Sequence, residues 1–170
     1  ATMLLAHEDR LYVEAVAAVD GGSTRRLTPP MALEDCDDVP QSIVQFVART
    51  RQALVLADAT KEDVFTQDTY VKDFQPLSVM GLPIVARNEV IGVLYVEHRW
   101  LTGVFTAQRV EVLSLLASQA AISIENARLY ADLQATRDEY RTPRRSEQSP
   151  PSASRPGADA IDRSFRASPR

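Results

Sequence analysis

The longest uninterrupted helical pattern, from Thr106 to about Tyr140, is the feature that most constrains what this chain can fold into. It contains no Gly or Pro, and it is rich in Leu, Ala, Glu, Gln and Arg, which lose little conformational freedom on entering a helix. Pro143 ends the pattern, because the residue before a proline is biased away from helix. The sequence therefore predicts one long helix over residues 106–140.

Two apolar stripes run along this helix, and the residues of one are displaced by two sequence positions from those of the other. The inner stripe is rich in small residues that suit close packing on a sheet, and comprises Leu113, Ala117, Ala120, Ile124, Ala127 and Ala131. The outer seam has the alternating three- and four-residue spacing of a coiled coil, and includes Leu115, Gln119, Ile122, Asn126, Leu129 and Leu133. Asn126 would take a core position, where a buried amide can fix register. The outer seam predicts a homodimer; the alternative is an amphipathic helix with a wide face buried inside a monomer.

Charge and composition divide the chain near the end of this helix. Residues 1–140 carry 12 Lys and Arg against 20 Asp and Glu, and an acidic surface argues against a nucleic-acid partner. Residues 141–170 are rich in Pro, Ser and Arg, so we expect a disordered tail. No apolar run reaches the length of a membrane span, and a single cysteine fits a reducing compartment. We therefore expect a cytoplasmic protein without a membrane partner.

Strand patterns fill most of the chain before the long helix. Residues 3–6 and 11–17 read as a hairpin, a short strand is expected at 25–27, and a helix is expected from Pro40 to about Arg51. Further strands are expected at 53–57, 78–86 and 90–97, and one or two short helices in the segment 59–74. The last strand is apolar on both faces up to Glu97, so both faces of the sheet should be covered. The long helix can cover one face, and residues 59–74 and 98–103 the other.

The chain at this point resembles a known family. The strand pair Leu82-Pro83-Ile84 and Val90-Ile91-Gly92-Val93-Leu94-Tyr95-Val96-Glu97, followed by Phe105-Thr106 at the start of the final helix, is similar to a GAF domain. The run from Ala117 to Tyr130 is similar to the GAF module of large bacterial signalling proteins that combine a serine/threonine-kinase-like domain with a histidine kinase. The resemblance covers roughly residues 1–136.

The resemblance implies an α+β fold with a central antiparallel sheet of about six strands. It also implies helices on one face, a ligand pocket on the other, and dimerisation through terminal helices. We expect the pocket to be lined by aromatic and a few polar side chains, as small-molecule cavities are, from Phe65, Tyr70, Phe74, Met80, Tyr95, Glu97 and Trp100. The alternative is that these side chains fill a closed core. The sequence identifies no cofactor.

The chain also departs from the family pattern. The N-terminal helix and the start of the first strand are missing, and the chain does not begin with Met, so we expect an N-terminally truncated fragment. No phosphoacceptor region, ATP-binding motif or Gly-rich phosphate loop follows the long helix. Kinase activity therefore belongs, if anywhere, to the parent protein.

These observations predict a non-catalytic sensory module that binds a small ligand or partner and relays the signal through a dimerising helix. The first alternative is a structural dimerisation module with no ligand. The second is a redox enzyme using Cys36, the only cysteine. Cys36 lies among four acidic residues, which should raise the pKa of its thiol and disfavour a reactive thiolate.

Overall fold

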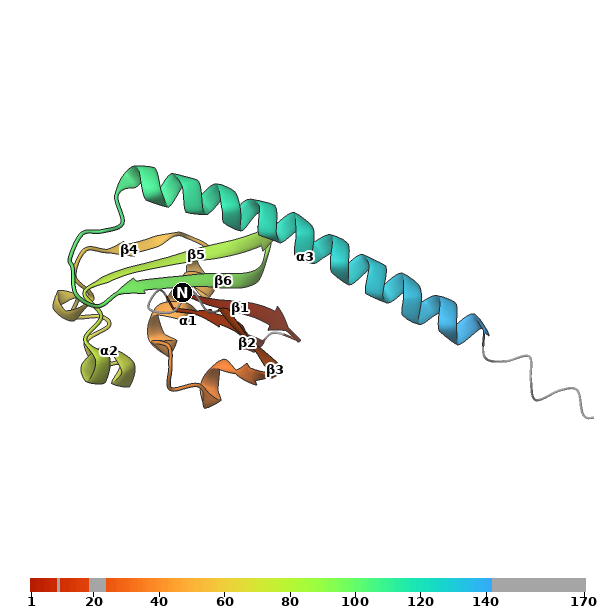
Figure 1. The fold of residues 1–170 in the computed structure, drawn as a ribbon, viewed down its shortest axis with the longest axis horizontal. Helices are drawn as coiled ribbons and strands as arrows, with labels where there is room; N and C mark the ends of the chain where they lie inside the picture. Colours follow the sequence, from red (N-terminus) through yellow and green to blue (C-terminus); the bar gives the residue numbers. More distant parts are fainter. Residues whose placement is uncertain (9, 19–23, 142–170) are drawn as a thin grey trace, which may run out of the picture. The chain divides into compact units, whose positions relative to one another are not determined.

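A six-stranded antiparallel sheet forms the centre of the protein (Figure 1). The computed structural model describes residues 1–8, 10–18 and 24–141, with side chains described up to residue 137. The strands are β1 (Thr2–His7), β2 (Arg10–Ala17), β3 (Thr24–Ala32), β4 (Leu54–Leu56), β5 (Ser78–Ala86) and β6 (Glu89–His98). They lie in the order β3-β2-β1-β6-β5-β4, and every neighbouring pair is antiparallel. The predicted antiparallel sheet is therefore confirmed, as are the hairpin at 3–6 and 11–17 and the strands at 78–86 and 90–97.

The strand β3 is longer than the predicted 25–27, because it continues through Pro29 and Pro30 to Ala32. Its register with β2 shifts: Ala15 faces Arg26, whereas Val13 faces Met31. The prolines lie within this shift and at the edge of the sheet, so their missing N–H groups interrupt no regular ladder.

Helices join the strands where the sequence predicted them. The helix α1 (Gln41–Thr50) begins after Pro40, and the segment 59–74 contains the 3₁₀ turn η3 (Ala59–Lys61) and the helix α2 (Thr69–Phe74). A further 3₁₀ turn, η2 (Leu33–Asp35), follows β3. Asp58 and Asp68 cap η3 and α2, each by accepting a hydrogen bond from a backbone N–H of the first turn.

The two faces of the sheet carry separate hydrophobic cores. One core joins Met80, Leu82 and Ile84 to the helix α3 (Ala107–Arg141). The other joins Leu4, Val13, Val79, Val93 and Tyr95 to the α1 side chains Ile43, Val44 and Val47. Gly81 permits this second contact, because a Cβ atom there would lie 2.7 Å from the Val47 side chain. Helices therefore cover both faces, and α1 is the addition to the prediction. Residues 59–74 lie on the α1 face as predicted, since Ala59, Phe65 and Val71 belong to that core.

The helix α3 spans Ala107–Arg141, close to the predicted 106–140. It crosses the boundary between two compact units, Ala1–Ala131 and Asp132–Arg170, and of the second unit the structure describes residues 132–141. The predicted disordered tail lies outside the described residues, apart from Arg141 at the end of α3. Within the described part of the chain, no helix is long and apolar enough to cross a membrane.

The inner stripe of α3 packs on the sheet along most of its length. Ala117 is buried, Leu113, Ala120 and Ile124 are partly buried, and the neighbouring Ala121 joins them. Ala127 and Ala131 are exposed, contrary to the prediction. The reason is that the sheet ends beneath this part of the helix: Arg87 of the β5–β6 turn pairs with Glu125, and Arg128 donates a 2.7 Å hydrogen bond to the carbonyl of Ala6, near the end of β1.

Candidate functional site

A polar cluster lies where β6 ends and α2 begins, and it is centred on the Glu97 carboxylate, whose side chain is 14% exposed. The Tyr70 hydroxyl donates to this carboxylate at 2.8 Å, and the Tyr95 hydroxyl donates to its Oε2 at 2.8 Å. Arg99 donates from Nε to Glu97 Oε1 at 2.7 Å and from Nη2 to the Tyr70 hydroxyl at 2.9 Å. The Arg99 guanidinium also lies 5.0 Å from the centre of the Phe74 ring. We call these five residues the Glu97 cluster.

Three side chains outside the cluster hold its elements in place. The Asp68 carboxylate accepts from Tyr70 N–H at 2.9 Å and from Ser42 N–H at 2.8 Å, so it ties the start of α2 to the start of α1. His98 Nδ1 accepts from Leu101 N–H at 3.0 Å. The buried Ser78 hydroxyl lies 3.0 Å from the Leu101 carbonyl oxygen. The loop that carries Arg99 is therefore anchored by groups other than Arg99 itself.

The two tyrosines of the cluster are held in their neutral form. Burial is the main cause that raises the pKa of Tyr70 and of Tyr95, and the charge of Glu97 and the hydrogen bonds to it raise both further. Both hydroxyls therefore remain donors to the carboxylate at physiological pH. The cluster offers one carboxylate, two fixed hydroxyl donors and three aromatic rings, which is suited to binding a polar or cationic group.

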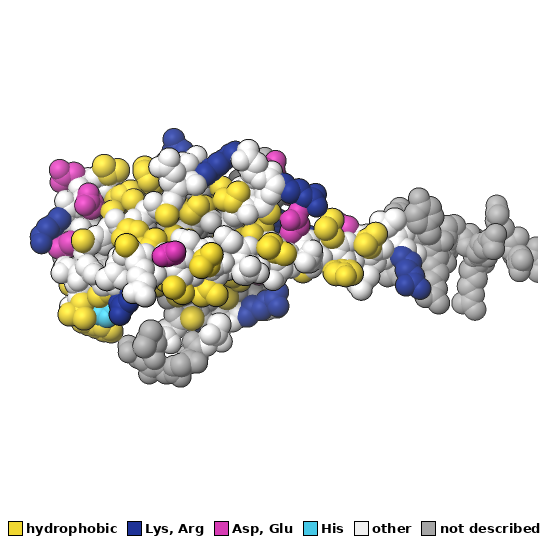
Figure 2. Space-filling view, turned by 90° about the horizontal axis from the view of Figure 1, so that it is seen from above, with side chains coloured by type: hydrophobic (Ala, Val, Ile, Leu, Met, Phe, Trp, Pro, Cys, Tyr) yellow, Lys and Arg dark blue, Asp and Glu magenta, His cyan; other side chains and the backbone are white. Residues whose placement is uncertain are grey.

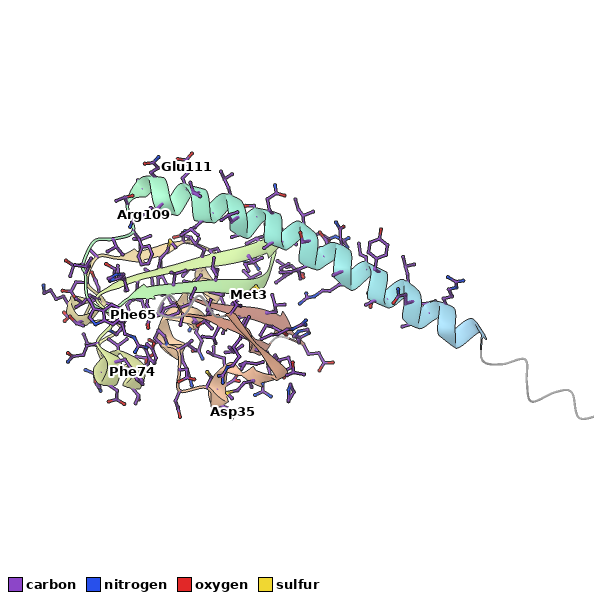
Figure 3. The ribbon with its side chains drawn as sticks, viewed as in Figure 1. Met3, Asp35, Phe65, Phe74, Arg109 and Glu111 are labelled. Atoms are coloured by element: carbon purple, nitrogen blue, oxygen red, sulfur yellow. The ribbon has the colours of Figure 1, made fainter. Side chains whose placement is uncertain are left out.

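The seven predicted pocket residues do not line one cavity. Tyr70, Phe74, Tyr95 and Glu97 do meet, and Phe65 and Phe74 lie at the same end of the molecule (Figure 3). Met80, however, is buried on the opposite face of the sheet, beneath α3. Trp100 is 71% exposed and packs edge-on against His98. Phe65 is buried and packs edge-on against Phe46 of α1.

Among the residues that the structure describes, two of the surface depressions lie away from the predicted pocket as a whole. One, of about 480 Å³, lies at the other end of the sheet and includes Arg10, Arg49 and Arg128 with Glu8, Glu34 and Glu89. The other, of about 450 Å³, lies between α1 and residues 64–65 and includes Ser42 and Phe65. The Glu97 carboxylate is instead contacted by side chains of the chain itself, among them Tyr70, Tyr95 and Arg99.

Arg99 was missed by the sequence reasoning, although a signal for it was present. Side chains alternate between faces along a strand, so Tyr95 and Glu97 share one face, and Arg99 extends the same two-residue spacing just beyond β6. A carboxylate followed two positions later by an arginine predicts an ion pair on that face.

Cys36 is buried in the core beneath α1. Burial is the main cause that raises the pKa of its thiol, and the nearby charges of Asp38 and Asp37 raise it further. The direction agrees with the prediction, but desolvation outweighs the acidic neighbours. A buried, neutral thiol is poorly suited to nucleophilic or redox chemistry. Among the described residues, no group of three His, Cys, Asp or Glu side chains could hold a metal ion.

The outer seam of α3 is exposed. Leu115, Ile122 and Leu133 are 64%, 54% and 67% exposed, and Gln119, Asn126 and Leu129 are also exposed. In the space-filling view from the α3 side, hydrophobic side chains are visible along this face (Figure 2). The alternative that the apolar residues of the outer seam are buried inside a single subunit is therefore wrong.

Comparison with known proteins shows the family. The model of the GAF domain matches residues 4–124. The hybrid signal transduction histidine kinase G of Dictyostelium discoideum is 39% identical over 89 residues, which is 52% of this chain and 3% of that protein. The peroxide stress-activated histidine kinase mak3 of Schizosaccharomyces pombe is 26% identical over 129 residues, which is 75% of this chain and 5% of that protein. Both relatives are eukaryotic. The similarity is therefore not confined to the large bacterial signalling proteins that the sequence resembles.

Solved structures share the fold. The GAF domain of a two-component sensor histidine kinase from Bacillus halodurans matches with a TM-score of 0.53 at 22% identity, over 76% of this chain and 83% of that one. The GAF domain/HD domain protein from Geobacter sulfurreducens matches with a TM-score of 0.53 at 21% identity, over 75% and 80% of the two chains. The family match, the six-stranded antiparallel sheet and the helices on it lead to one conclusion: this chain belongs to the GAF domain family.

Proposed function

We propose that the chain is a non-catalytic sensory module of a histidine-kinase-type signalling protein. In this proposal it binds a small ligand at the Glu97 cluster and pairs with a second copy through the outer seam of α3. The observation that carries the proposal is the exposure of large apolar side chains at coiled-coil spacing on the face of α3 that does not pack on the sheet. The relatives that are histidine kinases support the signalling context.

The outer seam offers enough apolar surface for association. Complete burial of one Leu or Ile side chain contributes about 1.5–3 kcal/mol, and each copy exposes four such side chains at seam positions: Leu115, Ile122, Leu129 and Leu133. Two copies together can therefore offset the several kcal/mol that association costs in lost freedom. Gln119 and Asn126 lie between these residues, and amides at core positions favour one register over others.

The Glu97 cluster lies close in the chain to the start of α3. The loop from Arg99 to Thr106 joins the end of β6 to α3, and Val104 N–H in this loop donates to the Ser78 hydroxyl at 3.1 Å. A ligand that prefers one arrangement of this loop would favour one position of the first turn of α3. Such a preference acts by shifting the populations of pre-existing states.

Sedimentation of the unmodified chain and of Asn126→Leu tests the pairing. We expect a concentration-dependent dimer for the unmodified chain. Asn126→Leu should associate more tightly or form larger assemblies, since a core Asn costs stability and restricts oligomer number. Concentration-independent monomers for both proteins would contradict the proposal.

Thermal unfolding in the presence of a metabolite library tests the ligand. A compound that binds the folded state raises the unfolding temperature by mass action. A dimer that no compound stabilises would favour the structural dimerisation module instead.

A further inference from the structure

We propose that the Glu97 cluster binds a small organic cation of the guanidinium or alkylammonium class. In the described structure the chain's own Arg99 occupies this site as an internal ligand. The inference deepens the proposed function, because it gives the chemical class of the ligand at the proposed sensory site. It is tested by binding alone, so it can fail while the pairing through α3 stands.

The groups around the Arg99 guanidinium are those that recognise a cation. The Glu97 carboxylate is nearly buried, and it accepts hydrogen bonds from Tyr70 and Tyr95 as well as from Arg99. A carboxylate in such a position is costly without a cationic partner. The rings of Phe74 and Tyr70 lie 5.0 Å and 5.9 Å from the guanidinium carbon, within the range where an aromatic face attracts a cation.

The Arg99 side chain can leave without unfolding its loop. It is 42% exposed, it follows the last residue of β6, and its hydrogen bonds within the cluster go to Glu97 and Tyr70. The loop backbone is held separately, by His98 Nδ1 at Leu101 N–H and by the Ser78 hydroxyl at Val104 N–H. Partly exposed ion pairs contribute little to stability, so a free cation that makes the same contacts can compete with this one.

Charge and shape define the ligand class. The carboxylate and the ring faces favour a positive group over a neutral or negative one, and the planar head of a guanidinium repeats the two hydrogen bonds that Arg99 makes. Phe74 is itself partly exposed, so the site is open on its outer side and can accept a ligand with a tail. Because Arg99 competes, the apparent affinity of the unmodified chain is reduced by the fraction of molecules in which Arg99 has left.

The experiment uses methylguanidinium as the probe and Arg99→Ala as the emptied site. The chain has a single tryptophan, Trp100, next to Arg99, so its fluorescence reports on the site. We expect a saturable fluorescence change in Arg99→Ala, with half-saturation at a concentration roughly threefold to fivefold below that of the unmodified chain. Urea, which has a similar shape but no charge, should give no saturable change.

Two further variants complete the design. Arg99→Ala combined with Glu97→Gln should lose the saturable response, because Gln keeps the size of the side chain but removes its charge. Arg109→Ala should behave as the unmodified chain, because Arg109 lies outside the cluster and donates a hydrogen bond to the Val104 carbonyl. Should Arg99→Ala not fold, Arg99→Gln replaces it in every titration.

A folded Arg99 variant with no saturable response to methylguanidinium would overturn the inference. The same holds for an equal response with and without the Glu97 charge. In either case the Glu97 cluster is a structural ion-pair network only.

Discussion

The two apolar stripes of α3 differ in the size of their side chains and in what covers them. The inner stripe meets the sheet through the buried Ala117, together with its neighbour Ala121, and through the partly buried Leu113 and Ile124. The outer seam carries the larger Leu115, Ile122 and Leu129, and all three are exposed. A helix that serves only its own domain normally buries its large apolar residues and exposes polar ones. Here the inner stripe holds α3 to the sheet, whereas the outer seam leaves its large apolar side chains uncovered, which the proposed pairing with a second copy would explain.

The largest expected effect is a difference in the free energy of unfolding between substitutions on the two sides of α3. Ala121→Asp places a carboxylate in the core beneath α3, and should lower the free energy of unfolding by about 3 kcal/mol or more. Ile122→Asp, on the next residue, faces solvent and should change it by less than about 0.5 kcal/mol in the monomer. Urea unfolding at a low protein concentration measures both. Equal losses for the two variants would contradict the assignment of the stripes.

A smaller effect is expected from the polar contacts that attach α3 to the sheet. Arg128→Ala removes the donor to the Ala6 carbonyl and should cost about 1 kcal/mol, the usual net value of one hydrogen bond. Arg87→Ala breaks a partly exposed pair with Glu125 and should cost less than about 1 kcal/mol. Urea unfolding checks whether each loss is below that of Ala121→Asp. A larger loss for either variant would show that polar contacts, rather than the inner stripe, hold the helix.

The smallest effect is expected outside α3, at Asp58. Hydrogen bonds from Thr60 and then Lys61 lower the pKa of the Asp58 carboxylate in the fold. Its contribution to stability is therefore fully present above the unfolded-state pKa of about 3.9, and it is lost as the pH falls through the lower folded value. Asp58→Asn should make the free energy of unfolding fall less steeply below about pH 4. It should leave the sedimentation behaviour unchanged. Acid unfolding with and without the substitution measures the difference.

Local sequence patterns were sufficient for most of the fold. The absence of Gly and Pro predicted the extent of α3, and apolar runs separated by polar turns predicted the paired strands. The length of β3 was not predictable in this way, because a shift in register lets Pro29 and Pro30 lie within a strand. Such a shift depends on the partner strand and not on the local sequence.

The candidate site was predictable only in part, and Met80 shows why. The turn at Arg87 and Asn88 would place Met80 opposite Tyr95, on one face, if the β5–β6 pairing were regular. An irregularity between Ile84 and Val85 moves the pairing by one residue, so that Met80 faces Val96 and lies beneath α3. The hydroxyls of two predicted residues, Tyr70 and Tyr95, do contact the carboxylate of a third, Glu97. Phe65 belongs instead to a separate contact with α1.

The most direct test of the central claim compares two Asp substitutions on α3 by sedimentation over a range of concentrations. Ile122→Asp charges the outer seam, and Ala131→Asp charges an exposed position outside it, so the pair matches in the introduced residue. The account predicts that Ala131→Asp dimerises as the unmodified chain does, whereas Ile122→Asp remains a monomer. Dimers of equal strength for both variants would contradict the claim that α3 pairs through its outer seam.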